Sequence, residues 1–160
     1  DPETDLGPMV DQAAVDRTHE WVREAVEGGA RALTGGEPDG QSYPPTVLVD
    51  VPRDARVCGE EVFAPVVNLF AVDSFEDALR EINDSRFGLQ CGIFTSSLDR
   101  TFAAHDELEV GGVIVNDVPT WRTDAMPYGG VKDSGLGREG LRWSIEDMTE
   151  PRLLAFAGRP

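Results

Sequence analysis

Apolar and polar positions along the chain follow helical and strand periods. Over residues 11–29 the apolar positions recur every three or four residues, and the stretch ends in two glycines. This pattern is typical of an amphipathic helix with a glycine stop. Ser74 and the serine pair at 96–97 each precede a further helical stretch, as N-capping residues do. Residues 141–148 predict a last short helix.

Short apolar or β-branched stretches between these helices predict six strands. They cover residues 30–34, 46–51, 66–72, 89–95, 111–116 and 152–156. The stretch 66–72 is almost continuously apolar, which is typical of a strand covered on both faces. Strands and helices alternate from residue 66 to residue 116, and right-handed crossovers bring such strands side by side. We therefore expect an α/β fold with a largely parallel sheet and helices on its faces.

The length of the chain fits a single domain with its own core. With 160 residues and 17.4 kDa, the chain is close to the usual size of one domain. We expect residues 1–148 to form it and residues 149–160 to be a terminal strand and tail. The strand expected at 152–156 carries three large apolar residues. An unpaired apolar edge is a template for a second chain, so we expect self-association.

The acidic charge excludes several classes of partner. A formal net charge of −16 opposes binding to nucleic acid or to an anionic membrane, because such binding depends on neutralising phosphates with Lys and Arg. No apolar run approaches the roughly 20 residues of a membrane span. No signal peptide is visible at the acidic N-terminus. We expect a cytoplasmic protein.

The cysteines and histidines indicate no metal centre. Cys58, Cys91, His19 and His105 lie far apart in the sequence. None of them forms a CxxC or HxxxH motif, so neither a metal site nor a disulfide framework is predicted. Two unpaired thiols agree with a cytosolic protein.

The acidic stretch before the third predicted strand is a candidate binding site. Glu60 and Glu61 are adjacent, and Phe63 follows just before Pro65. In a strand-like segment adjacent side chains point to opposite faces, so one carboxylate would face a cleft. There it could accept hydrogen bonds from the paired hydroxyls of a ribose, and the Phe63 ring could pack on a flat heterocycle. The alternative is a solvated acidic loop whose phenylalanine caps the core.

Several further motifs occur in a specific order and spacing. They are Asp-Leu-Gly-Pro at 5–8, Asn-Asp-Ser-Arg-Phe-Gly-Leu at 83–89, Val-Asn at 115–116 and Met-Pro-Tyr-Gly-Gly-Val-Lys-Asp-Ser-Gly-Leu-Gly-Arg-Glu at 126–139. Together with the acidic stretch they resemble the C-terminal, catalytic-domain part of the NAD(P)-dependent aldehyde dehydrogenase superfamily over nearly the whole chain. The similarity is greatest to the branch that handles lactaldehyde, glyceraldehyde 3-phosphate without phosphorylation, or phosphonoacetaldehyde. Ala64 stands where the family has Gly, and needs only an ordinary backbone angle.

The resemblance implies a role for each candidate residue. It places Glu61 on the nicotinamide ribose of NAD or NADP and Phe63 against the nicotinamide end. It makes the loop from Asn116 to Tyr128, including Trp121 and Arg122, a wall of the substrate tunnel. It also makes Glu139 part of a possible proton relay.

Two of these residues have alternative interpretations. Arg122 offers a forked, permanently charged donor set for a carboxylate or phosphonate, but it could instead pair with a nearby acid, Asp117 or Asp124 first. Glu139 could be a solvated or ion-paired carboxylate. Residues 135–140 match Gly-x-Gly-x-x-Gly, yet a dinucleotide fingerprint needs a preceding strand and a helix N-terminus free for pyrophosphate. Here a loop precedes the motif and Glu139 would repel the phosphates.

The resemblance also limits what this chain does alone. In the family a thiolate attacks the aldehyde, and the motif of that nucleophile surrounds neither Cys58 nor Cys91. We therefore expect both thiols to be structural and the isolated chain to be inactive. The predicted function is the oxidation of a small aldehyde, which could carry an anionic group, to its acid with NAD(P), within a homodimer or homotetramer. The alternative is a non-catalytic binding or self-association module.

Overall fold

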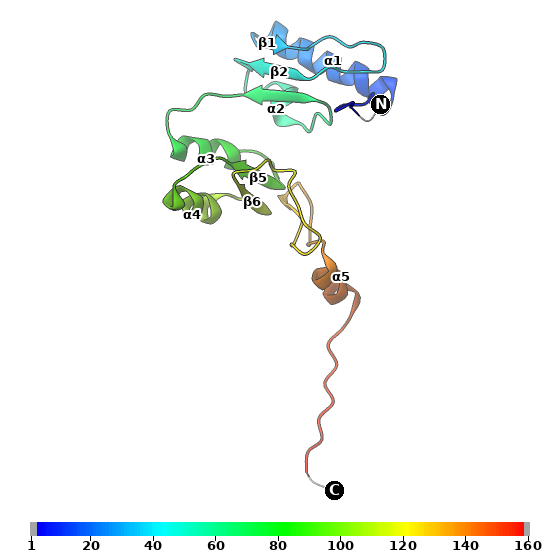
Figure 1. The fold of residues 1–160 in the computed structure, drawn as a ribbon, viewed down its shortest axis with the longest axis vertical. Coiled ribbons are helices and arrows are strands. Elements are labelled where there is room, and N and C mark those ends of the chain that lie inside the picture. The colour runs from blue at the N-terminus through cyan, green and yellow to red at the C-terminus, as the bar shows by residue number, and fades with distance from the viewer. Residues whose placement is uncertain (1–2, 159–160) are drawn as a thin grey trace. The chain divides into compact units, whose positions relative to one another are not determined.

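The computed structural model describes residues 3–158. The chain divides into two compact units, Asp1–Asp73 and Ser74–Pro160. The boundary between the units lies directly before Ser74, the residue that caps the helix Phe75–Asn83. Each unit has its own buried cluster and is described by itself (Figure 1).

The first unit packs two helices against a three-stranded sheet (Figure 1). Its elements are α1 (Gln12–Glu27), β1 (Arg31–Thr34), β2 (Thr46–Val49), α2 (Arg56–Gly59) and β3 (Val66–Leu69). The strands are ordered β1-β2-β3. The chain turns back between β1 and β2, which are antiparallel, whereas α2 lies in the crossover between the parallel strands β2 and β3.

Helix α1 begins and ends as the sequence predicts. The Asp11 side chain accepts a hydrogen bond from the backbone N–H of Ala14 at 2.8 Å and so caps the N-terminus. Gly28 follows the last turn. Thr18 is fully buried, and its hydroxyl donates to the Ala14 carbonyl at 2.8 Å, which satisfies a polar group inside the core.

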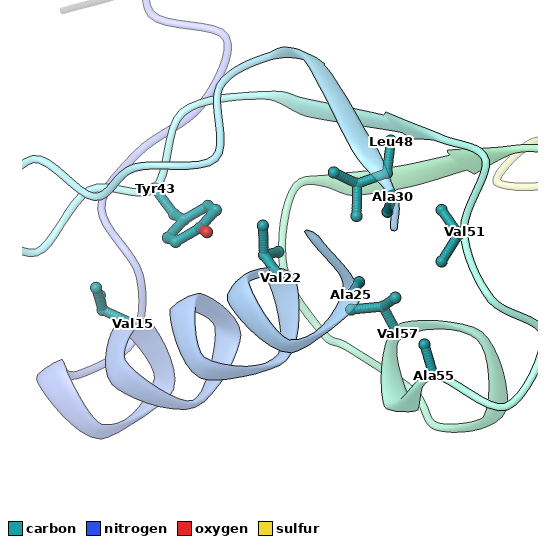
Figure 2. Packing of buried hydrophobic residues seen from close by; sticks show 9 residues of the cluster. All are labelled: Val15, Val22, Ala25, Ala30, Tyr43, Leu48, Val51, Ala55 and Val57. Carbon is teal, nitrogen blue, oxygen red and sulfur yellow. The ribbon is translucent and has the colours of Figure 1, made fainter. Parts of the chain in front are cut away.

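The core of the first unit lies between α1 and the sheet. Figure 2 shows Val15, Val22 and Ala25 on one face of α1, opposite Leu48 of β2 and the ring of Tyr43. The cluster is completed by residues from the connecting segments and α2: Ala30, Val51, Ala55 and Val57. The helical period of apolar residues therefore marks the buried face of α1.

The second unit consists of two small sheets with helices beside one of them. Its elements are α3 (Phe75–Asn83), β4 (Phe87–Gly88), β5 (Gln90–Ile93), α4 (Leu98–Glu107), β6 (Gly112–Val115), β7 (Val131–Lys132) and α5 (Leu141–Met148). β5 and β6 are parallel and joined through α4, which is the predicted strand–helix–strand unit. β4 and β7 form a separate antiparallel pair.

Serine caps start both long helices of the second unit. The Ser74 hydroxyl oxygen accepts from the Asp77 backbone N–H at 3.0 Å, and that of Ser97 accepts from the Arg100 N–H at 3.3 Å. Both caps agree with the sequence. Cys91 and Ile93 of β5 and Val113 of β6 then pack with α3 and α4 around Leu79.

The prediction of a single, largely parallel sheet is wrong. The described residues form one mixed three-stranded sheet and two separate two-stranded sheets. β3 pairs with β2 in the first unit, whereas β5 pairs with β6 in the second, so α3 does not join two strands of one sheet. β3 is also not covered on both faces within the chain, because Val67 and Leu69 are exposed.

The terminal strand expected at 152–156 is not formed within the chain. Residues 150–157 have no regular secondary structure and are exposed throughout. Strand geometry depends on a hydrogen-bonded neighbour, and α5 is the last regular element that the structure describes. Every helix within residues 3–158 is too short or too polar to span a membrane.

Candidate functional site

The acidic stretch joins α2 to β3 in the first unit. Helix α2 ends at Gly59, and residues 60–65 have no regular structure before β3 begins. Arg17 of α1 donates to the Val62 carbonyl at 3.3 Å and holds the stretch against the helix. The stretch forms no strand, although Glu60 has extended backbone angles, and the expectation that Glu60 and Glu61 face opposite sides stays a prediction.

Phe63 carries the unusual backbone conformation of this stretch. Its φ is 54°, in the left-handed region that non-glycine residues rarely adopt. Ala64 is not among the residues with positive φ, as expected of an alanine in place of glycine. The Phe63 side chain is 80% exposed, so the alternative in which it caps the core is wrong. The backbone directs a large aromatic ring outward, where it is available to a flat ligand.

The Glu61 carboxylate is available as an acceptor. Glu61 is exposed, and no hydrogen bond or ion pair within residues 3–158 engages its side chain. An unengaged carboxylate two residues from an outward ring is a suitable arrangement for a ribose and its attached heterocycle. This placement fits the residues to the cofactor that the sequence suggests, within the first unit alone.

Three of the candidate substrate and relay residues meet in the second unit. The Arg122 guanidinium lies 4.2 Å from the centroid of the Tyr128 ring, and its Nη2 lies 3.6 Å from Oε2 of Glu139. The backbones of Tyr128 and Glu139 exchange two hydrogen bonds, of 3.1 and 2.6 Å. An aromatic ring, a cation and a carboxylate are thus held together by a short bridge between two distant parts of the loop.

The partner of Arg122 is therefore Glu139. Neither Asp117 nor Asp124, the acids nearest in sequence, forms an ion pair with Arg122 among the described residues. The bridge to Tyr128 places Glu139 closer than either sequence neighbour. The interpretation of Glu139 as an ion-paired carboxylate describes the structure.

The loop that carries Arg122 is fixed to the β5–β6 sheet by Gln90. The Gln90 side-chain amide donates to the carbonyls of Pro119 and Trp121 at 2.5 and 3.4 Å. A Cβ at Gly92, also in β5, would lie 2.6 Å from the Asp117 carbonyl, so only glycine lets the loop approach so closely. We did not identify Gln90 from the sequence. Its signal is a long amide side chain within an otherwise small or apolar strand.

Asn116 and Trp121 belong to the same loop but not to the Arg122 cluster. Asn116 has a φ of 60°, and its Oδ1 accepts from the Thr95 N–H at 2.9 Å. This contact ties the end of β6 to the segment after β5. The Trp121 side chain is about half exposed. Asn116 therefore shapes the start of the loop, and Trp121 is available at its surface.

Comparisons with known proteins identify the family to which the chain belongs. The model of the aldehyde dehydrogenase family matches residues 1–154. The chain belongs to this family. The resemblance seen in the sequence is thereby confirmed at the level of the family, whereas the part of the family's structure that the chain represents stays a prediction.

Individual members of the aldehyde dehydrogenase family show the extent of the similarity. The 3-sulfolactaldehyde dehydrogenase of Priestia aryabhattai is 48% identical over 98% of this chain and 33% of its own length. The crystal structure of aldehyde dehydrogenase 21 from Physcomitrella patens, in complex with the reaction product succinate, is 47% identical with a TM-score of 0.92, and the match covers 94% of this chain and 31% of that one.

A third comparison concerns the cofactor. The glyceraldehyde-3-phosphate dehydrogenase of Methanocaldococcus jannaschii, complexed with NADP, is 37% identical with a TM-score of 0.87, over 92% of this chain and 32% of that one. The chain thus spans about a third of the length of the relatives it matches. The family is NAD(P)-dependent.

Neither thiol of this aldehyde dehydrogenase chain has the properties of an activated nucleophile. Burial raises the pKa of the Cys58 thiol, and Asp54 adds to the effect while Arg53 opposes it. Burial also raises the pKa of Cys91 in β5. The thiolate is the reactive form, so both environments disfavour it.

Lys132 is a structural residue that the sequence analysis did not single out. Its ammonium donates to the carbonyls of Asn83 and Ser85 at 2.6 and 3.1 Å and lies 2.9 Å from Oε2 of Glu109. It thus binds the C-terminal end of α3, where a cation is favoured. The signal in the sequence is that Lys132 is the only lysine. Across residues 3–158 no group of three His, Cys, Asp or Glu side chains could hold a metal ion.

Proposed function

We propose that this chain is the C-terminal part of the catalytic domain of an NAD(P)-dependent aldehyde dehydrogenase that oxidises a small anionic aldehyde to its acid. The observation that carries the proposal is the Arg122 cluster. A guanidinium stacked on Tyr128 keeps its planar donor fork presented to a ligand, and such a fork suits a carboxylate, sulfonate or phosphate. The names of 3-sulfolactaldehyde dehydrogenase and of the succinate complex support an anionic substrate.

Each candidate residue then has a definite task. Arg122 holds the anionic end of the aldehyde, while Asn116 and Trp121 form the neighbouring tunnel wall. Glu139 holds or passes a proton when water attacks the acyl intermediate. We place the nucleophilic thiolate and the general base outside these 160 residues, because neither Cys58 nor Cys91 is activated.

The cofactor residues lie in the first unit. When bound, NAD(P) supplies the acceptor for the hydride. Glu61 accepts hydrogen bonds from the paired hydroxyls of the nicotinamide ribose, and the outward ring of Phe63 packs at the nicotinamide end of the cofactor. Correct placement of the ribose orients the ring for transfer, and such positioning contributes several orders of magnitude to rate.

Charge-removing substitutions in a full-length enzyme that contains this chain test the cofactor assignment. We expect Glu61→Gln to lower kcat roughly tenfold or more, because hydrogen bonds to a charged acceptor contribute about 1.5–3 kcal/mol. Glu60→Gln, at the neighbouring exposed position, is the control. Steady-state kinetics with varied NAD(P) distinguish them, and equal effects would remove the assignment of Glu61.

Kinetics with two aldehydes that differ by one charged group test the anion clamp. We expect Arg122→Gln to raise KM for 3-sulfolactaldehyde by about tenfold and to change KM for lactaldehyde little. Arg142→Gln removes another exposed guanidinium, paired with Glu146 in α5, and is the control. If Arg122→Gln affects the two aldehydes equally, the clamp is refuted.

Self-association is a second candidate function, supported by the exposed terminal segment. Leu153, Leu154 and Phe156 are each at least 78% exposed, and large apolar side chains in that state favour burial against another chain. We propose a homodimer or homotetramer, with the segment forming a strand on a neighbour's sheet. Added salt should tighten it by screening the net charge of −16.

Sedimentation of the 160-residue chain at low and high salt measures this association. We expect at least a dimer, and Phe156→Asp should shift it toward monomer, while Val10→Asp, at another exposed apolar position, should not. A monomer at both salt concentrations, at about 100 micromolar, would contradict the proposal.

The same sample should show no dehydrogenase activity. Aldehyde-dependent reduction of NAD(P) that Cys58→Ala abolishes would show that the chain contains its own nucleophile.

A further inference from the structure

The ion pair between Arg122 and Glu139 suggests how the anion clamp is controlled. Oε2 of Glu139 lies 3.6 Å from the Arg122 guanidinium, and within residues 3–158 no hydrogen bond engages that guanidinium. A guanidinium has five N–H donors. Its donor fork is therefore neutralised by Glu139 but not saturated, and a second anion with better geometry can compete for it.

We propose that Glu139 occupies Arg122 in place of the substrate's anionic group, so that an anionic aldehyde displaces Glu139 from Arg122 and leaves its carboxylate free. The inference rests on the proposed anion clamp and deepens it. A neutral aldehyde leaves the Arg122–Glu139 pair intact. Recognition of the anionic end and release of Glu139 are then the same event.

The geometry lets the two side chains separate without unfolding the loop. Stacking on Tyr128 at 4.2 Å holds Arg122 independently of Glu139. The backbone of Glu139 is held by its two hydrogen bonds to Tyr128, so only the glutamate side chain has to rotate. That side chain is 70% exposed and that of Arg122 is 46% exposed, so a released carboxylate is rehydrated at little cost.

The exchange is favourable because the two competing anions differ in geometry. An exposed single-contact ion pair is weak and is screened by salt. A carboxylate or sulfonate that approaches along the planar fork can accept two parallel hydrogen bonds. The substrate therefore gains a stronger contact than the one it breaks, while the internal pair lowers its apparent affinity by a modest factor.

The test is a double-substitution experiment in a full-length enzyme that contains this chain. The quantity measured is the ratio of the dissociation constant of lactaldehyde to that of 3-sulfolactaldehyde, in the enzyme without NAD(P). No hydride transfer occurs under these conditions, so a loss of proton transfer after Glu139→Gln does not enter this ratio. Glu146→Gln removes a glutamate from another exposed arginine pair and is the matched control for charge.

We expect Glu139→Gln to raise the ratio about two- to fivefold at low ionic strength, which corresponds to about 0.4–1 kcal/mol. The gain should shrink with added salt and should vanish in the Arg122→Gln background. Glu146→Gln should leave the ratio unchanged.

Two results would overturn the inference. One is an unchanged ratio after Glu139→Gln, and the other is a gain that persists when Arg122 is also replaced. If Arg122→Gln lowers the ratio while Glu139→Gln does not raise it, the clamp stands and only the competition fails. If Arg122→Gln has no effect on the ratio, the proposed anionic substrate fails as well.

Discussion

The two units of the chain differ in how they use their residues. The first unit surrounds a cluster of nine buried residues with a continuous sheet and a helix of 16 residues, whereas the buried cluster of the second unit has three. Much of the second unit is instead the loop between β6 and α5, which is held by individual polar contacts and carries most of the candidate site. A large apolar core stabilises the first unit, and specific hydrogen bonds shape the second.

The largest expected effect tests the core of the first unit. Leu48 is completely buried between β2 and α1, so we expect Leu48→Ala to lower the free energy of unfolding by about 2–5 kcal/mol, from lost burial and the cavity left behind. Urea unfolding followed by Trp21 fluorescence, with the other two tryptophans replaced by Phe, reports on this unit. Leu136→Ala, at a fully exposed leucine, should change the free energy by less than about 0.5 kcal/mol. Similar losses would contradict the assignment of the core.

A smaller effect tests whether polar contacts shape the second unit. Lys132→Met removes two hydrogen bonds and an ion pair from the end of α3, and we expect a loss of about 1–2 kcal/mol. Arg142→Met breaks only the exposed i,i+4 pair with Glu146 and should lose no more than about 0.5 kcal/mol. Unfolding followed by Trp143 fluorescence, with Trp21 and Trp121 replaced by Phe, measures both. Equal losses would show that the Lys132 contacts add no stability.

The smallest effect concerns a polar group inside the first core. Burial, with a lesser contribution from Glu37, raises the pKa of Tyr43 to about 12, and its hydroxyl donates to the Gly36 carbonyl at 3.0 Å. At pH 9 we expect Tyr43→Phe to lower the free energy of unfolding by about 1 kcal/mol through loss of this hydrogen bond.

The size of this difference depends on pH. An unfolded tyrosine loses its proton near pH 10 and the folded one near 12, so the unfolded state binds fewer protons between these values. The contribution of Tyr43 is therefore complete below pH 10 and falls as the pH rises toward 12, whereas the Tyr43→Phe variant has no such proton to lose. Urea midpoints of both proteins at about pH 9 and 11 check this; a difference that stays constant would refute the raised pKa.

The sequence by itself determined the local elements. Residues 11–29 predicted α1, residues 141–148 predicted α5, and Ser74 and the 96–97 pair marked the starts of α3 and α4. Helical hydrogen bonds and caps join residues at most four positions apart, so a single stretch contains all the information they need. The family was evident for a related reason, since its motifs are short and ordered along the chain.

Only the tertiary structure decided which elements and side chains meet. The composition of the apolar stretch 66–72 does not reveal which strand lies beside it. β3 forms from this stretch and pairs with β2, whereas β5 pairs with β6, and this choice depends on how the long connecting segments fold. Other acidic residues lie closer to Arg122 in sequence than Glu139 does, but the backbone bridge between Tyr128 and Glu139 brings the Glu139 carboxylate to the guanidinium. Contacts between residues far apart in sequence depend on the path of the whole chain. The energy of one strand pair or one ion pair differs little from that of its alternatives, so the local sequence does not select between them.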